Sequence, residues 1–302
     1  MADPRLIKKR VSSVKNIGKI TKALEMVSAS KVQKAQNAAI NAKPYARVIY
    51  ELVSSLAKDK IVEIPLMRIP EEPRTDLYII VSTNRGLAGS LNTNLFNFLA
   101  AYLVQRKTFK HYFVTIGKKG RSFAVSNGEL TADFSDQKDI AGLVSAVVKL
   151  ITDGFVSGSY DAVYIVYSEF INALRQEPKV KHILPISKLE LEEEIKKEHF
   201  GILGEPVEKL ASENTRANYS FEPDPVTVLV SLLPFYIEIQ IAESIYESEA
   251  SEHSARMVAM KNATDNASEL FDSLSLEYNK ARQALITTEI SDITTAQTTI
   301  KD

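Results

Sequence analysis

The chain has 302 residues, of which 45% are hydrophobic and 25% charged, and its net charge of −1 is ordinary for a water-soluble globular protein. It contains no cysteine, so disulfides, thiolate metal sites and cysteine nucleophiles are excluded. No apolar run approaches the roughly 18 residues of a membrane span, and the N-terminus "MADPRLIKKR" has no apolar signal region, so we expect a cytoplasmic protein without a span of its own.

The charges are distributed unevenly along the chain. Residues 1–60 carry 13 Lys+Arg against 4 Asp+Glu, a net of +9, whereas residues 235–302 carry 5 against 12, a net of −7. A basic arm alone would suggest an anionic partner such as nucleic acid. Because the basic end is matched by an acidic one, we expect the two ends to lie side by side.

The N-terminal segment has helical periodicity. Between Arg5 and Ala57 the only helix breakers are Gly18 and Pro44, and we expect Pro44 to kink the helix or mark a joint in it. Apolar residues recur at steps of three and four, which predicts a helix near the seven-residue repeat of a coiled coil. This apolar stripe consists of Ile7, Val11, Val14, Ile17, Ile20, Leu24 and Val27, then Ala35, Ala38 and Ala42, then Ile49, Leu52 and Leu56.

The middle of the chain alternates between strand-like and helix-like residue patterns. Runs rich in β-branched and aromatic residues predict strands at 76–82, 111–117, 161–170 and 181–187. Helical patterns at 92–106, 119–127 and 137–153 separate the first three runs, which predicts βαβ units and a small, mainly parallel sheet of Rossmann-like type. The charged run at 187–199 predicts a solvated linker helix.

The stretch "STNRGLAGSLN", residues 82–92, stands where a strand meets a helix, as phosphate-binding loops do. A P-loop requires GxxxxGK[ST], but here Gly86 and Gly89 are too close and Ser90-Leu91 replaces the Lys-[Ser/Thr] pair. The dinucleotide fingerprint GxGxxG is also missing. We therefore favour a tight turn with Asn92 capping the next helix over a nucleotide site.

The C-terminal segment contains neither Gly nor Pro after Pro234, over 68 residues. Ile237, Ile241 and Ile245 step by four, and small residues then follow at helical spacing before Leu270, Leu274, Tyr278 and Leu285. We expect a helix to about Ile290, since the Thr-rich tail would fray. This helix should pair with the N-terminal helix as an antiparallel coiled coil.

Catalytic signals are missing from the sequence. The four histidines are scattered without metal-ligand spacing, and His253, beside Glu249 and Glu252, fits a surface position on a long helix better than an acid–base role. The basic helix has almost no aromatic residues for base stacking, which argues against nucleic acid. We expect no catalytic, cofactor or metal site.

Four stretches resemble the gamma subunit family of F-type ATP synthases. They are "IKKRVSSVKNIGKITKALEMVSASKVQKAQ" (7–36), "NRGLAGSLN" (84–92), "ASEHSARMVAMKNATDNASEL" (250–270) and "LEYNKARQALITTEISDI" (276–293). The chain departs from the family pattern at Asn84, often Asp, and at Thr295-Ala296, usually Gly-Ala. Neither difference affects a group with a plausible catalytic role.

The resemblance implies a proton-driven rotor shaft. Its coiled coil, segments 1–64 and 219–302, would turn inside a ring of alpha and beta subunits, and its α/β domain, 74–205, would contact the epsilon subunit and the membrane c-ring. It implies partner contacts at Arg282, Gln283 and Thr287, with Lys22 and Lys31 facing acidic beta-subunit loops. It also implies a peripheral position on the cytoplasmic side of a bacterial inner membrane.

Two other interpretations remain open from the residues alone. One is a soluble coiled-coil interaction protein or enzyme whose α/β domain binds a nucleotide. The other is a cytoskeletal or chaperone-like coiled coil.

Overall fold

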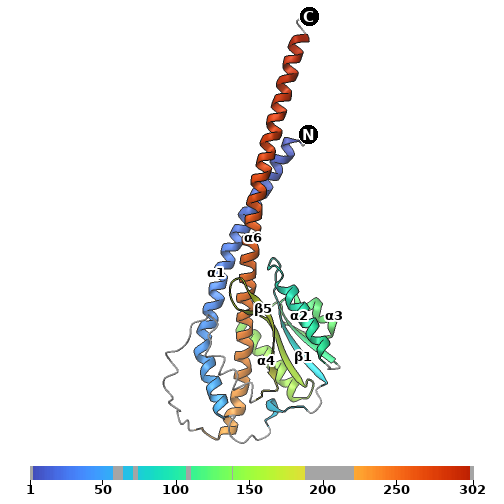
Figure 1. Ribbon diagram of the computed structural model, residues 1–302. Helices are drawn as coiled ribbons and strands as arrows, with labels where there is room; N and C mark the ends of the chain where they lie inside the picture. The colour runs from blue at the N-terminus through green and yellow to red at the C-terminus, as the bar shows by residue number, and fades with distance from the viewer. Residues whose placement is uncertain are drawn as a thin grey trace. The chain divides into compact units, whose positions relative to one another are not determined.

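The computed structural model describes residues 3–56, 64–70, 74–106, 110–137, 139–187 and 221–299 (Figure 1). The chain divides into two compact units: the first joins residues 1–29 to 256–302, and the second spans 30–255. Most of the predicted linker helix at 187–199 lies outside the described residues, as do parts of the boundaries proposed for the domains 1–64, 74–205 and 219–302.

The elements of the chain, in order, are α1 (Pro4–Leu56), the 3-10 helix η1 (Pro65–Met67), β1 (Thr75–Val81), α2 (Leu91–Gln105), β2 (Lys110–Ile116), α3 (Gly120–Asn127), β3 (Glu129–Asp133), α4 (Ile140–Val156), β4 (Ala162–Phe170), β5 (Gln176–Leu184) and α6 (Pro225–Thr299). The five strands form one sheet in the order β3-β2-β1-β4-β5, in which only β5 is antiparallel to its neighbour. The predicted α/β class with a mainly parallel sheet is confirmed.

Two strands differ from the sequence-based expectation. β3 was not predicted, because its five residues "ELTAD" alternate between exposed and half-buried positions and include no apolar run. β5 begins at Gln176 rather than residue 181, and it contains Pro178. Proline is tolerated there because β5 is an edge strand, where one side of the ladder needs no amide donor.

The second unit has three layers around its sheet. On one face, the C-terminal half of α1, α4 and the first turns of α6 bury the large cluster that includes Tyr50, Val147, Phe155 and Ile237. On the other face, α2 and α3 cover a smaller cluster around Tyr78, Leu99 and Phe113. Figure 1 shows α2 and α3 on the side of the sheet opposite α1 and α6. The sheet is therefore buried on both faces, as parallel strands require.

The start of α6 is more apolar than the sequence analysis recognised. By length and composition alone, α6 contains a stretch that is apolar enough to cross a membrane. Its side chains Leu233, Ile237 and Ile241 are, however, fully buried in the core of the second unit. This segment is accounted for as a core helix, because its apolar face already covers the sheet.

The first unit is an antiparallel helix pair. A Cβ atom added to Gly18 of α1 would lie 3.6 Å from Cβ of Ala267 of α6, and the hydroxyl of Thr264 donates to that of Thr21 at 2.8 Å. Thr21 comes three residues after Gly18 in α1, whereas its partner Thr264 comes three residues before Ala267 in α6. The two helices therefore run in opposite directions. The predicted antiparallel coiled coil is confirmed for this unit.

The buried seam of this pair follows the predicted apolar stripe only in part, since Ile7 is buried and Val11, Val14 and Leu24 are half-buried. Ile17, Ile20 and Val27 are 52%, 59% and 54% exposed, so the prediction that they line the seam was wrong. From Ile7 and Val14 the seam continues at seven-residue spacing through the polar residues Thr21 and Ser28, both buried. These side chains hydrogen-bond to main-chain carbonyls of their own helix or across the pair, which lets the two helices approach closely.

Both terminal helices pass through a proline without a break. α1 has 53 residues and contains Pro44, and α6 has 75 residues and contains Pro234. α1 thus continues beyond the expected joint at Pro44. α6 continues to Thr299, nine residues beyond the point where the Thr-rich tail was expected to fray.

Candidate functional site

Three of the predicted contact residues lie together near the end of α6 in the first unit. Arg282, Gln283 and Thr287 are all exposed. The Thr287 hydroxyl donates to the main-chain carbonyl of Gln283 at 2.9 Å, one turn back along the helix. Thr287 is thus hydrogen-bonded within α6, while Arg282 and Gln283 present a cation and an amide at the surface.

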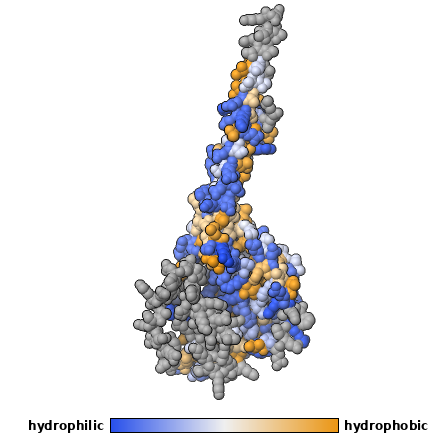
Figure 2. Space-filling view, viewed as in Figure 1, coloured by the Kyte–Doolittle hydropathy of each residue, from blue (hydrophilic) through white to orange (hydrophobic). Residues whose placement is uncertain are grey.

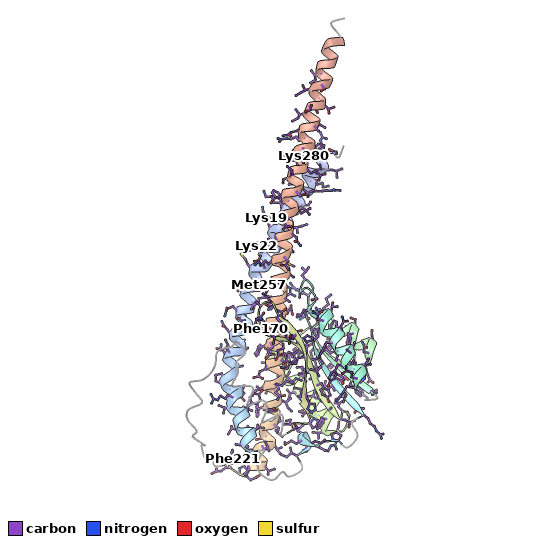
Figure 3. The ribbon with its side chains drawn as sticks, in the orientation of Figure 1. Lys19, Lys22, Phe170, Phe221, Met257 and Lys280 are labelled. Carbon is purple, nitrogen blue, oxygen red and sulfur yellow. The ribbon has the colours of Figure 1, made fainter. Side chains whose placement is uncertain are left out.

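Lys22 lies elsewhere on the same helix pair. Its side chain is 54% exposed, and its ammonium group is 3.0 Å from the Glu25 carboxylate. It is next to Thr21, which contacts Thr264, and Thr264 is 18 residues from Arg282. At 1.5 Å per residue that separation is about 27 Å along α6. The structure therefore does not bring Lys22 together with Arg282 and Gln283 (Figure 3 labels Lys22 and, two residues before Arg282, Lys280).

Lys31 belongs to the second unit. It is exposed, and together with Lys34 it acts on Glu249 of α6. Burial and the neighbouring Glu252 raise the pKa of Glu249, while the two lysines oppose this rise. Here a basic stretch of α1 faces an acidic stretch of α6, as the opposite charges of the two chain ends predicted.

The surface of the first unit mixes residue types. Figure 2 shows hydrophilic residues interspersed with hydrophobic ones over the visible face of this unit. Its exposed large apolar residues are Leu6, Ile17, Ile20, Met26 and Val27 on α1 and Leu270, Leu276, Leu285, Ile286, Ile290 and Ile293 on α6. On α6, Ile286, Ile290 and Ile293 recur at steps of four and three and so share one face of the helix.

The turn at 82–92 is held by its own hydrogen bonds. The prediction that Asn92 caps α2 was wrong, because α2 already starts at Leu91. Instead, the Asn92 side-chain oxygen accepts a hydrogen bond from the main-chain N–H of Thr83 at 3.3 Å, and the Asn92 side-chain nitrogen donates to the Thr83 hydroxyl at 2.8 Å. Leu87, with φ of 66°, and Gly89, with φ of 57°, take the left-handed conformations that close the turn. The side chains of Thr83 and Asn92 thus form hydrogen bonds within the turn itself.

The cations near this turn have carboxylate neighbours. Lys118 pairs with Asp136 at 2.8 Å, and Arg121 lies 3.7 Å from Asp133. Burial alone would raise the pKa of Asp133, but hydrogen bonds from Ser135 and Thr115 outweigh burial and lower it. This edge of the sheet thus offers paired charges, which favours the turn interpretation over a phosphate site.

A buried polar cluster at the opposite end of the parallel strands was not predicted from the sequence. Asp76 is fully buried at the start of β1, and its carboxylate accepts from the Tyr78 hydroxyl at 3.0 Å and pairs with Arg106 at 3.3 Å. The guanidinium lies 4.7 Å from the ring centre of Tyr164, to whose hydroxyl it also donates. Burial raises the pKa of both tyrosines well above the usual range. The sequence feature that could have indicated this cluster is Asp76, an acidic residue at the start of the apolar run "DLYIIV".

Within the described ranges of the chain, no group of three or more His, Asp or Glu side chains is placed to hold a metal ion. His253 is half-buried on α6.

The family model for ATP synthase matches residues 4–300. The gamma chain of Opitutus terrae ATP synthase is 41% identical over 302 residues and the alignment covers 98% of each chain; that of Methylacidiphilum infernorum is 40% identical, covering 98% of this chain and 99% of the relative.

Two solved structures share the fold. One is the rotor of the Euglena gracilis mitochondrial ATP synthase, with a TM-score of 0.59 and 20% identity over 94% of this chain and 98% of that one. The other is the central stalk and c-ring of the Tetrahymena thermophila mitochondrial ATP synthase, with a TM-score of 0.56 and 23% identity over 81% and 99%. The full-length identity to curated relatives decides the assignment: the chain belongs to the ATP synthase gamma chain family.

Proposed function

We propose that this chain is the central-stalk rotor of a proton-translocating ATP synthase. Proton flow through a membrane c-ring turns the shaft, and the turning shaft drives the catalytic sites of an alpha/beta head through their binding states. The observation that carries the proposal is the identity of about two residues in five with curated gamma chains along the whole chain.

The parts of the chain take separate roles in this proposal. The coiled-coil segments 1–64 and 219–302 form the shaft inside the head, and the α/β domain 74–205 binds the epsilon subunit and the c-ring. The chain itself is non-catalytic, and nucleotide chemistry belongs to the alpha and beta subunits. The complex is peripheral to a bacterial inner membrane on its cytoplasmic side.

The surface of the first unit supports a turning role. A shaft must exchange its contacts as it rotates, so a large apolar anchor on its outer face would lock one orientation. The exposed side chains there include polar and charged groups as well as apolar ones, and Arg282 and Gln283 offer contacts through a charge and an amide. Such contacts are individually weak at a solvated surface and can be broken and remade.

The test replaces Arg282 and Gln283 together with alanine. We expect the isolated chain to fold normally, since both side chains are exposed, while its affinity for the alpha/beta head falls by about tenfold, as expected when interface contacts worth roughly 1.4 kcal/mol are lost. ATP synthesis by the reassembled complex should fall as well.

The matched control is Lys261→Ala with Asn262→Ala, which removes an exposed cation and amide from the same helix. The control should retain its activity. Loss of the fold in the Arg282/Gln283 variant, or equal losses in both variants, would contradict a specific contact at these two residues.

A further inference from the structure

The β4–β5 hairpin is fastened to α6 in the second unit. The Ser251 hydroxyl donates to the Ser168 carbonyl at 2.9 Å, and the Ser254 hydroxyl donates to the Ala173 carbonyl at 2.8 Å. Phe170, at the end of β4, forms a small buried cluster with Ala35 of α1 and Ala250 of α6 (Figure 3). Directional bonds and apolar packing together fix the hairpin on the helix.

Glu247 lies four residues before Ser251, so it is one turn away on the same side of α6. Its Oε2 atom is buried, and none of the described residues supplies a hydrogen bond to it. A carboxylate oxygen left buried without a donor is costly, because its hydration is lost and not replaced. The site therefore disfavours the ionised form of Glu247.

The charged groups around Glu247 come from three elements. Glu169 of β4 and Lys179 and Lys181 of β5 act on it from the hairpin, and Glu243 acts on it from α6. Glu169 is paired with Lys179, and Glu243 accepts a hydrogen bond from the Tyr50 hydroxyl of α1 at 2.9 Å. Lys179 therefore shares its charge with Glu169 and does not fully compensate Glu247.

Burial, followed by the charge of Glu169, raises the pKa of Glu247 from 4.5 to about 7, with Lys179 and Lys181 opposing the rise and Glu243 adding to it. His182 is one residue from Lys181 and thus on the other face of β5, where its ring lies 5.1 Å from that of Tyr164. The groups that act on Glu247 from the hairpin and from α6 are two carboxylates and two ammonium groups.

We propose that Glu247 is a proton-operated latch: its neutral form lets the β4–β5 hairpin close on α6, and its ionised form weakens that contact. In an opened hairpin the carboxyl is hydrated and ionises near the ordinary pKa of 4.5. The closed state thus binds more protons between pH 4.5 and 7, and its stability falls as pH rises through that window. The latch is a property of the chain itself and does not depend on the proposed function.

The test compares the wild-type chain with Glu247→Gln by hydrogen–deuterium exchange of the hairpin amides, corrected for the intrinsic pH dependence of exchange. Between pH 6 and pH 8 the opening constant of the wild type should rise roughly tenfold, since the closed state alone loses its proton in that interval. In Glu247→Gln, whose side chain is neutral at every pH, the opening constant should not change. His111, His182 and His253 are retained in the variant, so the difference isolates Glu247.

The control is Glu269→Gln, the same chemical change at an exposed position of α6, which should keep the tenfold dependence. A tenfold rise that persists in Glu247→Gln would overturn the proposal. If that variant does not fold, infrared titration of the wild-type chain with carboxyl-labelled glutamate decides the question. A carboxyl band that titrates near pH 7 and is not exposed to solvent supports the latch, whereas titration of all glutamates near pH 4.5 refutes it.

Discussion

At the scale of single residues, the buried ion pair between Asp76 and Arg106 is the most consequential feature of the α/β domain. Asp76 is fully buried, whereas the Arg106 side chain remains 32% exposed. A buried charge loses its hydration, and the attraction of its partner only roughly offsets that loss. The pair therefore adds little to the free energy of unfolding. The cost appears only when one partner is removed.

Replacing Arg106 with leucine should therefore destabilise the chain by about 3 kcal/mol, the lower end of the range for breaking a buried pair, because the arginine is partly hydrated. Urea unfolding followed by circular dichroism measures the change. The double variant Asp76→Asn with Arg106→Leu removes the stranded charge and should recover part of the loss. If the double variant is less stable than Arg106→Leu alone, the cluster is held by packing rather than by charge.

At the scale of elements, two glycines with opposite environments make matched predictions. Gly18 lies in the interior of α1, where a Cβ would meet Ala267 at an ordinary 3.6 Å. Gly18→Ala should raise stability by about 0.5–1 kcal/mol, the difference between glycine and alanine in a helix interior.

Gly117 provides the contrast, because its φ is 95° and a Cβ would lie 1.9 Å from the Ser82 carbonyl oxygen. Gly117→Ala should cost about 2 kcal/mol or more through strain and steric overlap. Thermal unfolding of both variants measures the two effects. A loss of stability in Gly18→Ala would show that the helices of the first unit are too close together at Gly18 and Ala267 to accommodate a Cβ atom.

Periodicity predicted which elements form, but only part of the faces that they bury: Ile49 and Ile237 of the predicted stripes are buried, whereas Ile17 and Ile20 are not. The three strands with apolar runs and the three short helices were predicted within a few residues, because a core on both faces of a parallel sheet requires such runs. The edge strand β3 needed no apolar run. In α1, Ile17 and Ile20 were assigned to the seam by their hydrophobicity, yet Gly18 and Thr21 occupy it. Close helix approach selects small side chains, and that preference depends on a partner helix 240 residues away.

The partner-contact residues could be located on the helices from the sequence, but not grouped. Arg282 and Gln283 are neighbours on one exposed turn, whereas Lys22 lies beside a different part of α6. The half-buried Glu247, whose Oε2 atom is buried, was unpredictable because its environment comes from β4 and β5, which are distant in sequence. Only the tertiary contacts distinguish it from the exposed glutamates of the same helix.

At the scale of the whole molecule, the opposite charges of the two chain ends should make stability depend on salt. Residues 1–60 carry a net of +9 and residues 235–302 a net of −7, and Lys31 and Lys34 act on the half-buried Glu249. Salt shortens the screening length from about 10 Å at 0.1 M to about 3 Å at 1 M, so attraction beyond direct contact is lost.

We expect the thermal midpoint of the helical signal to fall by about 2–4 °C between 0.1 M and 1 M NaCl, which corresponds to roughly 1 kcal/mol for a chain of this size. The control is Lys31→Gln with Lys34→Gln, which removes two of the cations facing Glu249 and should show a smaller fall. NaCl also strengthens apolar burial slightly, so a midpoint that rises equally in both chains would mean that the charges of the two ends do not hold the helices together. A fall confined to the wild type would instead locate the attraction at the contact between Lys31, Lys34 and Glu249.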